Sequence, residues 1–280
     1  MNGALKGRGE TRNQYPFLSS PGLGEVFGGG GTPDRSRTCD LCLRRAALYP
    51  AELLVLGKGK ASISGPRIMF NESVLKQKVG EILAIQAEFR ICNLPWPETA
   101  LSEGERVRLQ SFTHFGRRLD WLRGRAALKG LLGKWGQSED TAELQFPNSR
   151  LSVSHSGGLA IAGGILSGSG FGLDYEAGRQ MRPETARFFL SAEEQRNAAL
   201  NSPNQLLRLW TVKEALFKAD LSNAGKGLRN YRVMNLSAMS GKAFGSENTG
   251  TGTEFVYASW KWETGFLTVA VPASFSQAFA

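Results

Sequence analysis

The sequence contains few of the residues from which disulfide frameworks and zinc sites are built. Its 280 residues include three cysteines, Cys39, Cys42 and Cys92, and two histidines, His114 and His155. Three cysteines do not make the paired framework that holds small secreted domains together. Cys39 and Cys42 have the spacing of half a zinc site, but the sequence has no second pair, and neither histidine has ligand spacing. We therefore expect neither a disulfide-bonded fold nor a zinc centre.

The sequence also lacks a long hydrophobic run. No stretch approaches the roughly 20 apolar residues that a membrane-spanning helix requires. The first residues do not form an apolar core followed by a small-residue cleavage site, which is the pattern of a secretory signal. Apolar residues make up 41% of the chain and aromatic residues 10%, which is ordinary for a globular protein. We expect a cytoplasmic protein that has no membrane partner.

The basic net charge favours an acidic partner without defining it. The formal charge of the chain is +9, and such a charge steers acidic molecules toward a protein. Residues 1–66 contain nine Lys and Arg against five Asp and Glu, so the remainder of the chain carries about +5. We find no basic aromatic motif of the kind that binds nucleic acid. We therefore expect an acidic protein or a polyphosphate as the partner, and not nucleic acid.

Residues 1–66 differ in character from the rest of the chain. Residues 28–31 are a run of four glycines within a segment that has no sustained periodicity, which is typical of a flexible segment. Residues 31–53 resemble the conceptual translation of a transfer-RNA gene, the product of a start codon assigned too far upstream. We therefore expect residues 1–66 to be disordered or misassigned and to contribute nothing to activity. Met69 is an alternative start.

Residues 67–167 have the pattern of a folded α+β unit. Ser102 and Glu105 form a Ser-x-x-Glu capping box, which predicts the start of a helix. Apolar residues then recur at helical spacing up to Leu132, in one helix or in two helices that break near Gly116. Two strand-like runs around a glycine turn follow, at residues 150–155 and 159–166.

Residues 168–280 repeat this mixture of helices and strands. Ser191 and Glu194 form a second capping box, and Pro203 begins the main helix, which extends to about Asp220. The other predicted elements are a short helix at 182–189 and strands at 171–176, 231–236, 254–262 and 266–271. Because the two blocks have similar content, we predict an α+β fold made of two similar α+β subdomains.

A pair of carboxylates makes the strand at residues 171–176 a candidate magnesium site. Asp174 and Glu176 are two positions apart on this strand, so both side chains point to the same face. Carboxylates that face one way repel each other unless a cation lies between them. An all-oxygen site with few protein ligands suits Mg²⁺, which also binds water and phosphate oxygens. The alternative is a solvated strand face that has no function.

The helix that begins at Pro203 carries the second set of candidates. Trp210 and Phe217 belong to its apolar stripe, so we expect both in the core. Glu214 and Lys218 are four residues apart on a shared face. They could form only an exposed salt bridge, worth about 0.2–0.5 kcal/mol. Alternatively, Glu214 completes a three-carboxylate magnesium site and Lys218 binds the phosphate that the metal also contacts.

His155 and its neighbour Ser154 stand at the end of a predicted strand, before a glycine turn. A histidine in this position is often structural or simply exposed. The alternative is contact with a phosphate or a substrate at the loop. A serine hydrolase is not supported, because adjacent Ser and His side chains on a strand point apart.

These candidates fall within five fragments that follow one another with compatible spacing. The fragments are LSVSHS at 151–156, FGLDYE at 171–176, RFFLSAEE at 187–194, WTVKEALFKA at 210–219 and GKGL at 225–228. Together they resemble the surfactin-synthetase-activating type of the 4′-phosphopantetheinyl transferase superfamily. The resemblance covers residues 67–272 and is sharpest over 150–229.

The resemblance implies a pseudo-dimer of two α+β halves in one chain, with CoA and magnesium in the cleft between them. It also implies the reaction, in which phosphopantetheine moves from CoA to a serine of an apo acyl or peptidyl carrier protein. Adenosine 3′,5′-bisphosphate is the other product. A monomer is expected, because both halves belong to one chain.

Residue roles follow from the same resemblance. Asp174, Glu176 and Glu214 would hold the magnesium. Glu214 would also activate the carrier serine, directly or through a metal-bound water, and Lys218 would act on the pyrophosphate. The CoA contacts would be Ser154, His155, Lys218 and Arg125.

A catalytically inactive module that binds CoA or a carrier protein is the alternative function. General chemistry agrees with catalysis, since a cation and a lysine near the leaving phosphate lower the barrier to attack. Serine is a weak nucleophile and needs a base within hydrogen-bond reach. The sequence names no particular carrier, because fatty acid, polyketide and nonribosomal peptide carriers present similar surfaces.

Overall fold

The computed structural model describes residues 71–196, 202–245 and 252–277. All of these residues belong to one compact unit of the chain. The predicted N-terminal extension, residues 1–66, lies outside the described residues. The described part is an α+β fold with antiparallel sheets, as predicted. In these ranges no helix is long and apolar enough to cross a membrane.

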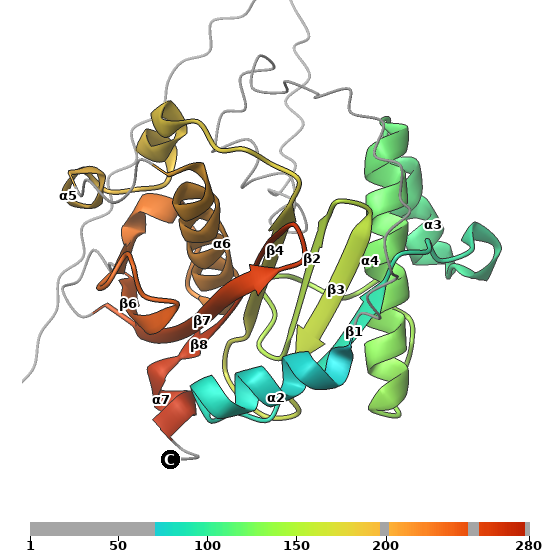
Figure 1. Ribbon diagram of the computed structural model, residues 1–280. Coiled ribbons are helices and arrows are strands. Elements are labelled where there is room, and N and C mark those ends of the chain that lie inside the picture. Colours follow the sequence, from blue (N-terminus) through green and yellow to red (C-terminus); the bar gives the residue numbers. More distant parts are fainter. Residues whose placement is uncertain (1–70, 197–201, 246–251, 278–280) are drawn as a thin grey trace, which may run out of the picture. The chain divides into compact units, whose positions relative to one another are not determined.

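The first half of the fold is a small sheet with a long helix across it. Its elements are α2 (Glu72–Leu83), β1 (Glu88–Cys92), η3 (Glu98–Ala100), α3 (Glu103–Gln110), α4 (Phe115–Lys134), β2 (Leu151–Ser156) and β3 (Leu159–Gly164). The strands pair antiparallel in the order β1-β3-β2. Gly157 and Gly158 join β2 to β3 with φ values of 60° and 82°, as a two-residue hairpin turn of type I′ requires. Helix α4 lies along this sheet (Figure 1).

Two predictions for this half are confirmed and one is refined. The capping box is present, because Ser102 accepts from the backbone N–H of Glu105 while the Glu105 side chain accepts from that of Ser102. The predicted hairpin corresponds to β2 and β3. The long helical run is two helices, α3 and α4, and the break lies at residues 111–114, just before Gly116.

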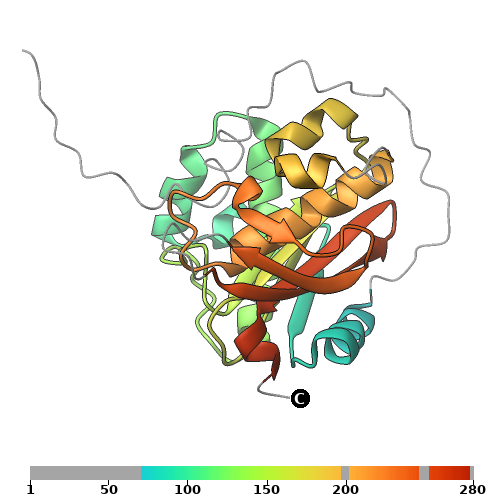
Figure 2. The same cartoon turned by 90° about the vertical axis from the view of Figure 1, so that its left-hand side faces the viewer.

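The second half is a larger sheet packed against one central helix. Its elements are β4 (Gly172–Ala177), η4 (Pro183–Phe188), α5 (Ala192–Gln195), α6 (Pro203–Ala219), η6 (Leu228–Asn230), β5 (Tyr231–Val233), β6 (Ser240–Gly245), β7 (Glu254–Trp262), β8 (Gly265–Pro272) and α7 (Ala273–Gln277). The strand order is β4-β8-β7-β6-β5, and every pair is antiparallel. Helix α6 crosses this sheet (Figure 2) and packs on β4 and β8.

The second half differs from the sequence prediction in several elements. The strand predicted at 231–236 ends at Val233, and the helix α7 was not predicted. The short helix expected at 182–189 is a 3-10 helix, η4. Strand β6 was not predicted, because its sequence SGKAFG contains two glycines and has no sustained alternation of apolar and polar residues. It pairs with β7 and β5 nonetheless, so its neighbours determine its conformation.

A shared hydrophobic core joins the two sheets. Phe89 and Ile161 of the first sheet pack in one cluster with Leu173, Tyr175 and Val269 of the second. Leu173 and Tyr175 alternate along β4 with Asp174 and Glu176, which therefore point to the opposite face, toward α6. The alternation separates the core side of β4 from its polar side.

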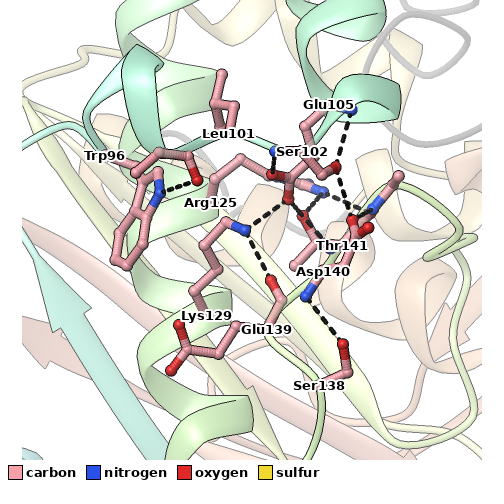
Figure 3. A network of polar contacts seen from close by, with 12 residues as sticks. Trp96, Leu101, Ser102, Glu105, Arg125, Lys129, Ser138, Glu139, Asp140 and Thr141 are labelled. Atoms are coloured by element: carbon pink, nitrogen blue, oxygen red, sulfur yellow. Dashed lines mark hydrogen bonds and ion pairs between the residues drawn. The ribbon is translucent and has the colours of Figure 1, made fainter.

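Each half contains a buried ion pair between a capping-box glutamate and a lysine of the long helix. The capping-box carboxylate Glu105 lies 2.9 Å from Lys129 of α4 (Figure 3), and the exposed fractions of these side chains are 0% and 4%. The second capping box is also confirmed, and its Glu194 lies 2.7 Å from Lys213 of α6, with 4% and 0% exposed. Each pair joins a short capped helix to the long helix of its own half.

Candidate active site

The polar face of β4 lies directly beneath α6. A Cβ atom added at Gly172 would stand 1.9 Å from the carbonyl oxygen of Ala215 and 2.6 Å from the backbone nitrogen of Ala219. Only glycine therefore permits this approach of helix to strand. The close packing brings the segment of α6 that carries Glu214 and Lys218 next to β4, the strand that carries the candidate carboxylates.

Asp174 lies at the centre of the polar face and is only 4% exposed. Its Oδ1 accepts two hydrogen bonds, from Lys218 Nζ at 2.8 Å and from Ser154 Oγ at 2.9 Å. Its Oδ2 is buried and has no hydrogen-bond partner among the residues that the structure describes. A buried carboxylate oxygen without a partner costs free energy and calls for an explanation such as a bound ion. Thus Oδ1 of Asp174 has two hydrogen-bond donors, whereas Oδ2 has no donor in the described part of the chain.

Glu176 is 8% exposed and is held on both oxygens. Arg179 Nη1 donates to Oε1 at 2.9 Å, and the Ser156 hydroxyl donates to Oε2 at 3.0 Å. Sequence reasoning missed both residues. A basic residue three positions beyond the carboxylate was the available signal for Arg179, and the turn at Gly178, with φ at 66°, brings it back toward Glu176.

Glu214 stands on the face of α6 that is turned toward β4 and β8. On a helix, residues three and four apart are neighbours, so Glu214 lies between Thr211 and Lys218. Lys218 binds Asp174, and the Thr211 hydroxyl lies 2.8 Å from that of Thr268, the register partner of Asp174 on β8. Glu214 is 8% exposed. The structure thus brings Glu214 and Lys218 to the strand that carries Asp174.

The segment that carries these residues is similar to a known protein family. Residues 170–271 match the model of the 4′-phosphopantetheinyl transferase superfamily. A search of curated proteins gave no match. The superfamily match begins just before β4 and ends within β8, so it contains Asp174, Glu176, Glu214 and Lys218. It supports a transferase.

The superfamily match raises the question of whether the carboxylates fit a cation. Across the described ranges, no three His, Cys, Asp or Glu side chains are grouped so that they could hold a metal ion. The three-carboxylate site of Asp174, Glu176 and Glu214 therefore stays a prediction. A two-carboxylate site fits better, because Mg²⁺ commonly takes one or two carboxylates and completes its shell with water and phosphate. The unpartnered Oδ2 of Asp174 is the oxygen that suits such a cation.

Lys213, next to Glu214, is a buried lysine whose partner the sequence did not indicate. Its side chain is completely buried, and burial lowers the pKa of Lys213 although the charge of Glu194 opposes this shift. Both oxygens of Glu194 accept from Lys213 Nζ at 2.7 Å, and the backbone carbonyl of Tyr231 accepts from it as well. These bonds tie α6 to α5 and to β5 at the residue next to Glu214.

Trp210 and Phe217 lie in the core, as predicted. They are 6% and 8% exposed and belong to one cluster with Phe189, Leu206 and Val212. Trp210 packs edge-on against Phe189, with ring centroids 5.4 Å apart. Both residues therefore shape the helix packing and do not reach the polar face.

His155 and Ser154 lie on β2, outside the segment that the superfamily match covers. His155 Nδ1 is 3.9 Å from Asp120 Oδ2 of α4, and its side chain is largely buried. Ser154 is buried, and its hydroxyl points to β4, where it binds Asp174. Their predicted contacts with the nucleotide end of CoA stay predictions.

Arg125 lies on α4, in the network that surrounds Glu105 (Figure 3). Its Nη1 donates to the Thr141 hydroxyl at 3.1 Å, and its guanidinium stacks 4.9 Å from the ring centroid of Trp121. Both contacts orient the guanidinium within the first half. The CoA contact expected of Arg125 stays a prediction.

Proposed function

We propose that the protein transfers the 4′-phosphopantetheine group from CoA to a serine of an apo acyl or peptidyl carrier protein. The other product is adenosine 3′,5′-bisphosphate. The observation that carries the proposal is the pair Asp174 and Glu176, buried on one face of β4 beneath Glu214 and Lys218. All four residues lie within the superfamily match. The sequence fragments favour the surfactin-synthetase-activating type, with two similar halves in one monomeric chain.

Asp174 and Glu176 are the residues that would hold Mg²⁺, and Glu214 is the candidate for a third ligand. When bound, the cation supplies positive charge at the pyrophosphate, which offsets the negative charge that grows on the leaving phosphate. Asp174 Oδ2 supports this assignment, since it is buried and lacks a hydrogen-bond partner in the described part of the chain.

Lys218 is proposed to bind the CoA phosphates. Its ammonium donates to Asp174 Oδ1 and to the Leu173 carbonyl, at 2.8 and 3.2 Å, and its side chain is 19% exposed. A lysine is a compact charge on a flexible stem, so Lys218 can turn from Asp174 toward a phosphate without a change of backbone. Its charge then stabilises the leaving bisphosphate.

Glu214 is proposed to accept the proton of the carrier serine. A serine hydroxyl attacks a phosphate poorly unless a base takes its proton. Glu214 is 8% exposed and stands on the same face of α6 as Lys218, so the carrier serine is proposed to lie against this face. His155, Ser154 and Arg125 would contact CoA from the first half, and the basic charge of the chain favours an acidic carrier.

Replacement of Glu214 by Gln tests the proposed base. The amide keeps the size of the side chain but accepts no proton, so transfer from CoA should fall about 10²–10⁴-fold. The readout is incorporation of a labelled pantetheine group into an apo carrier. Asp174→Ala should also be nearly inactive.

Glu193→Gln is the matched control for this experiment. Glu193 is exposed and forms a surface ion pair with Arg232 at 2.9 Å, which contributes little to stability. The control should transfer at the wild-type rate. Normal rates in both Glu214→Gln and Asp174→Ala would sink the site assignment.

A module that binds CoA or a carrier protein without chemistry is the second candidate. The observation in its favour is that no three-carboxylate metal group occurs among residues 71–196, 202–245 and 252–277. Calorimetry with CoA, together with the transfer assay on a panel of apo carriers, separates the two functions. Binding of CoA without turnover on any carrier would favour the module.

A further inference from the structure

Three serine hydroxyls join the two sheets where β2 runs beside β4. Ser152, Ser154 and Ser156 occupy alternate positions of β2, so their side chains point the same way. Each hydroxyl accepts a 3.0 Å hydrogen bond from a backbone N–H of β4; the donors are Leu173, Tyr175 and Ala177. β2 and β4 belong to different sheets, so these side chains form a ladder between them.

The serines differ in the group that accepts their own proton. Ser154 Oγ lies 2.9 Å from Asp174 Oδ1, and Ser156 Oγ lies 3.0 Å from Glu176 Oε2. A hydroxyl has one proton to give, and its bond to a carboxylate is stronger than its bond to a carbonyl. All three hydroxyls also lie near a β4 carbonyl, at 3.3 to 3.4 Å. Ser152 stands opposite Gly172, so the described structure offers it this carbonyl and no carboxylate.

We propose that Ser154 and Ser156 are positioning residues that fix the carboxylates of Asp174 and Glu176 for the metal. The inference rests on the proposed function, since it assumes that these carboxylates bind a cation. Ser154 and Lys218 both bind Oδ1 of Asp174, which directs Oδ2 away from them as the available ligand. Ser156 restrains Glu176 through Oε2, while Arg179 holds Oε1.

Because the serines belong to β2, the orientation of the Asp174 and Glu176 carboxylates depends on a strand of the first half. The hydroxyl of Ser154 binds both the N–H of Tyr175 and the Asp174 carboxylate, so the register of β2 against β4 and the rotamer of Asp174 are linked. β2 lies outside residues 170–271, the segment that matches the superfamily model. The metal site thus requires residues from both sheets.

The test measures Mn²⁺ affinity by electron paramagnetic resonance on the full chain and on three single variants. Ser154→Ala and Ser156→Ala should each bind Mn²⁺ about 10–100-fold more weakly than wild type, as is typical when a residue that orients a metal ligand is lost. Ser152→Ala is the matched control, because it loses the same type of backbone bond but touches no carboxylate in the described structure. Its Mn²⁺ affinity should equal that of wild type.

Thermal unfolding separates positioning from a purely structural role. Ser152→Ala and Ser154→Ala should lower Tm by similar amounts, since each leaves one β4 N–H of the ladder unpaired. Ser156→Thr, which keeps the hydroxyl at a half-buried position, should restore Mn²⁺ affinity. Equal Mn²⁺ affinity in Ser152→Ala, Ser154→Ala and Ser156→Ala would overturn the inference.

Asp174→Ala distinguishes failure of the inference from failure of the proposed function. One outcome is that wild type and the serine variants bind Mn²⁺ equally well while Asp174→Ala does not bind it. In that case only the positioning role is wrong. If wild type and Asp174→Ala bind Mn²⁺ equally or not at all, the metal site is wrong and the positioning role is overturned with it.

Discussion

At the scale of single residues, the buried carboxylates that the structure describes differ in whether both oxygens have partners. Glu105 and Glu194 pair with buried lysines, whereas Asp174 keeps one oxygen without a partner in the described ranges. A buried charge is tolerated when it is paired and hydrogen-bonded. The difference therefore separates structural carboxylates from a candidate ligand.

Glu105 provides a test of this distinction through acid unfolding. Burial alone would raise the pKa of Glu105, but hydrogen bonds from Thr141, Lys129 and the Ser102 backbone lower it from 4.5 to about 2. A carboxyl whose pKa is lowered by folding stabilises the protein above its unfolded pKa. This stabilisation should be lost as the pH falls from about 4.5 to about 2.

Urea unfolding of wild type and Glu105→Gln across that pH range measures the contribution. The variant should be about 3–5 kcal/mol less stable at neutral pH, because Lys129 then remains buried without its partner. Its stability should also fall less steeply below pH 4.5. Parallel pH profiles for the two proteins would contradict this account of Glu105.

At the scale of elements, the approach of α6 to β4 determines where the catalytic candidates lie. Gly172→Ala places a Cβ 1.9 Å from the Ala215 carbonyl oxygen, so backbone must move. We expect a loss of about 1–3 kcal/mol in the free energy of unfolding, together with weaker transfer activity because Glu214 and Lys218 are displaced. Chemical denaturation and the transfer assay measure both effects.

Gly116→Ala serves as the control, since a Cβ there meets nothing within 4 Å and the residue lies in α4. Alanine favours helix over glycine by up to about 1 kcal/mol, so this variant should be slightly more stable and fully active. If Gly172→Ala behaved like Gly116→Ala, the close packing of α6 on β4 would not be what positions the site.

The elements that were predictable are those specified by local sequence. Capping boxes at Ser102 and Ser191, the proline that begins α6 and the glycine turn between β2 and β3 act within a few residues. Strand β6 was missed because its pairing partners, and not its own pattern, make it a strand. The break between α3 and α4 was located only to within a few residues.

The site was predictable only in part, for a related reason. The two-residue spacing of Asp174 and Glu176 on a strand was enough to predict that they share a face. The contacts of Arg179, Ser156 and Lys218 with these carboxylates depend on tertiary packing, which spacing does not encode. The third carboxylate, Glu214, was assigned as a ligand from the resemblance and not from spacing, and this role stays a prediction.

At the scale of the whole molecule, the two halves contain the same type of buried ion pair. A common hydrophobic core and the serine ladder of β2 join them. A short capped helix (α3 or α5), a long helix (α4 or α6) and an antiparallel strand pair (β2–β3 or β7–β8) follow one another in the same order in both halves. This order supports the proposal of a pseudo-dimer.

Deletion of residues 1–66 tests the limits of the functional chain. These residues lie outside both the described structure and the superfamily match, and their sequence predicts no fold. A chain without residues 1–66 should therefore transfer phosphopantetheine at the full-length rate and unfold at the same temperature. A clear loss of activity or a lower Tm in the shortened chain would show that the extension belongs to the protein.

The most direct test of the central claim is mass spectrometry of an apo carrier protein incubated with CoA, Mg²⁺ and the full-length chain. The account predicts that the carrier gains the mass of one phosphopantetheine group on a serine. It also predicts that an equal amount of adenosine 3′,5′-bisphosphate appears and that a chelator stops both. If no carrier from the fatty acid, polyketide and nonribosomal peptide classes is modified while CoA still binds, the protein is not this transferase.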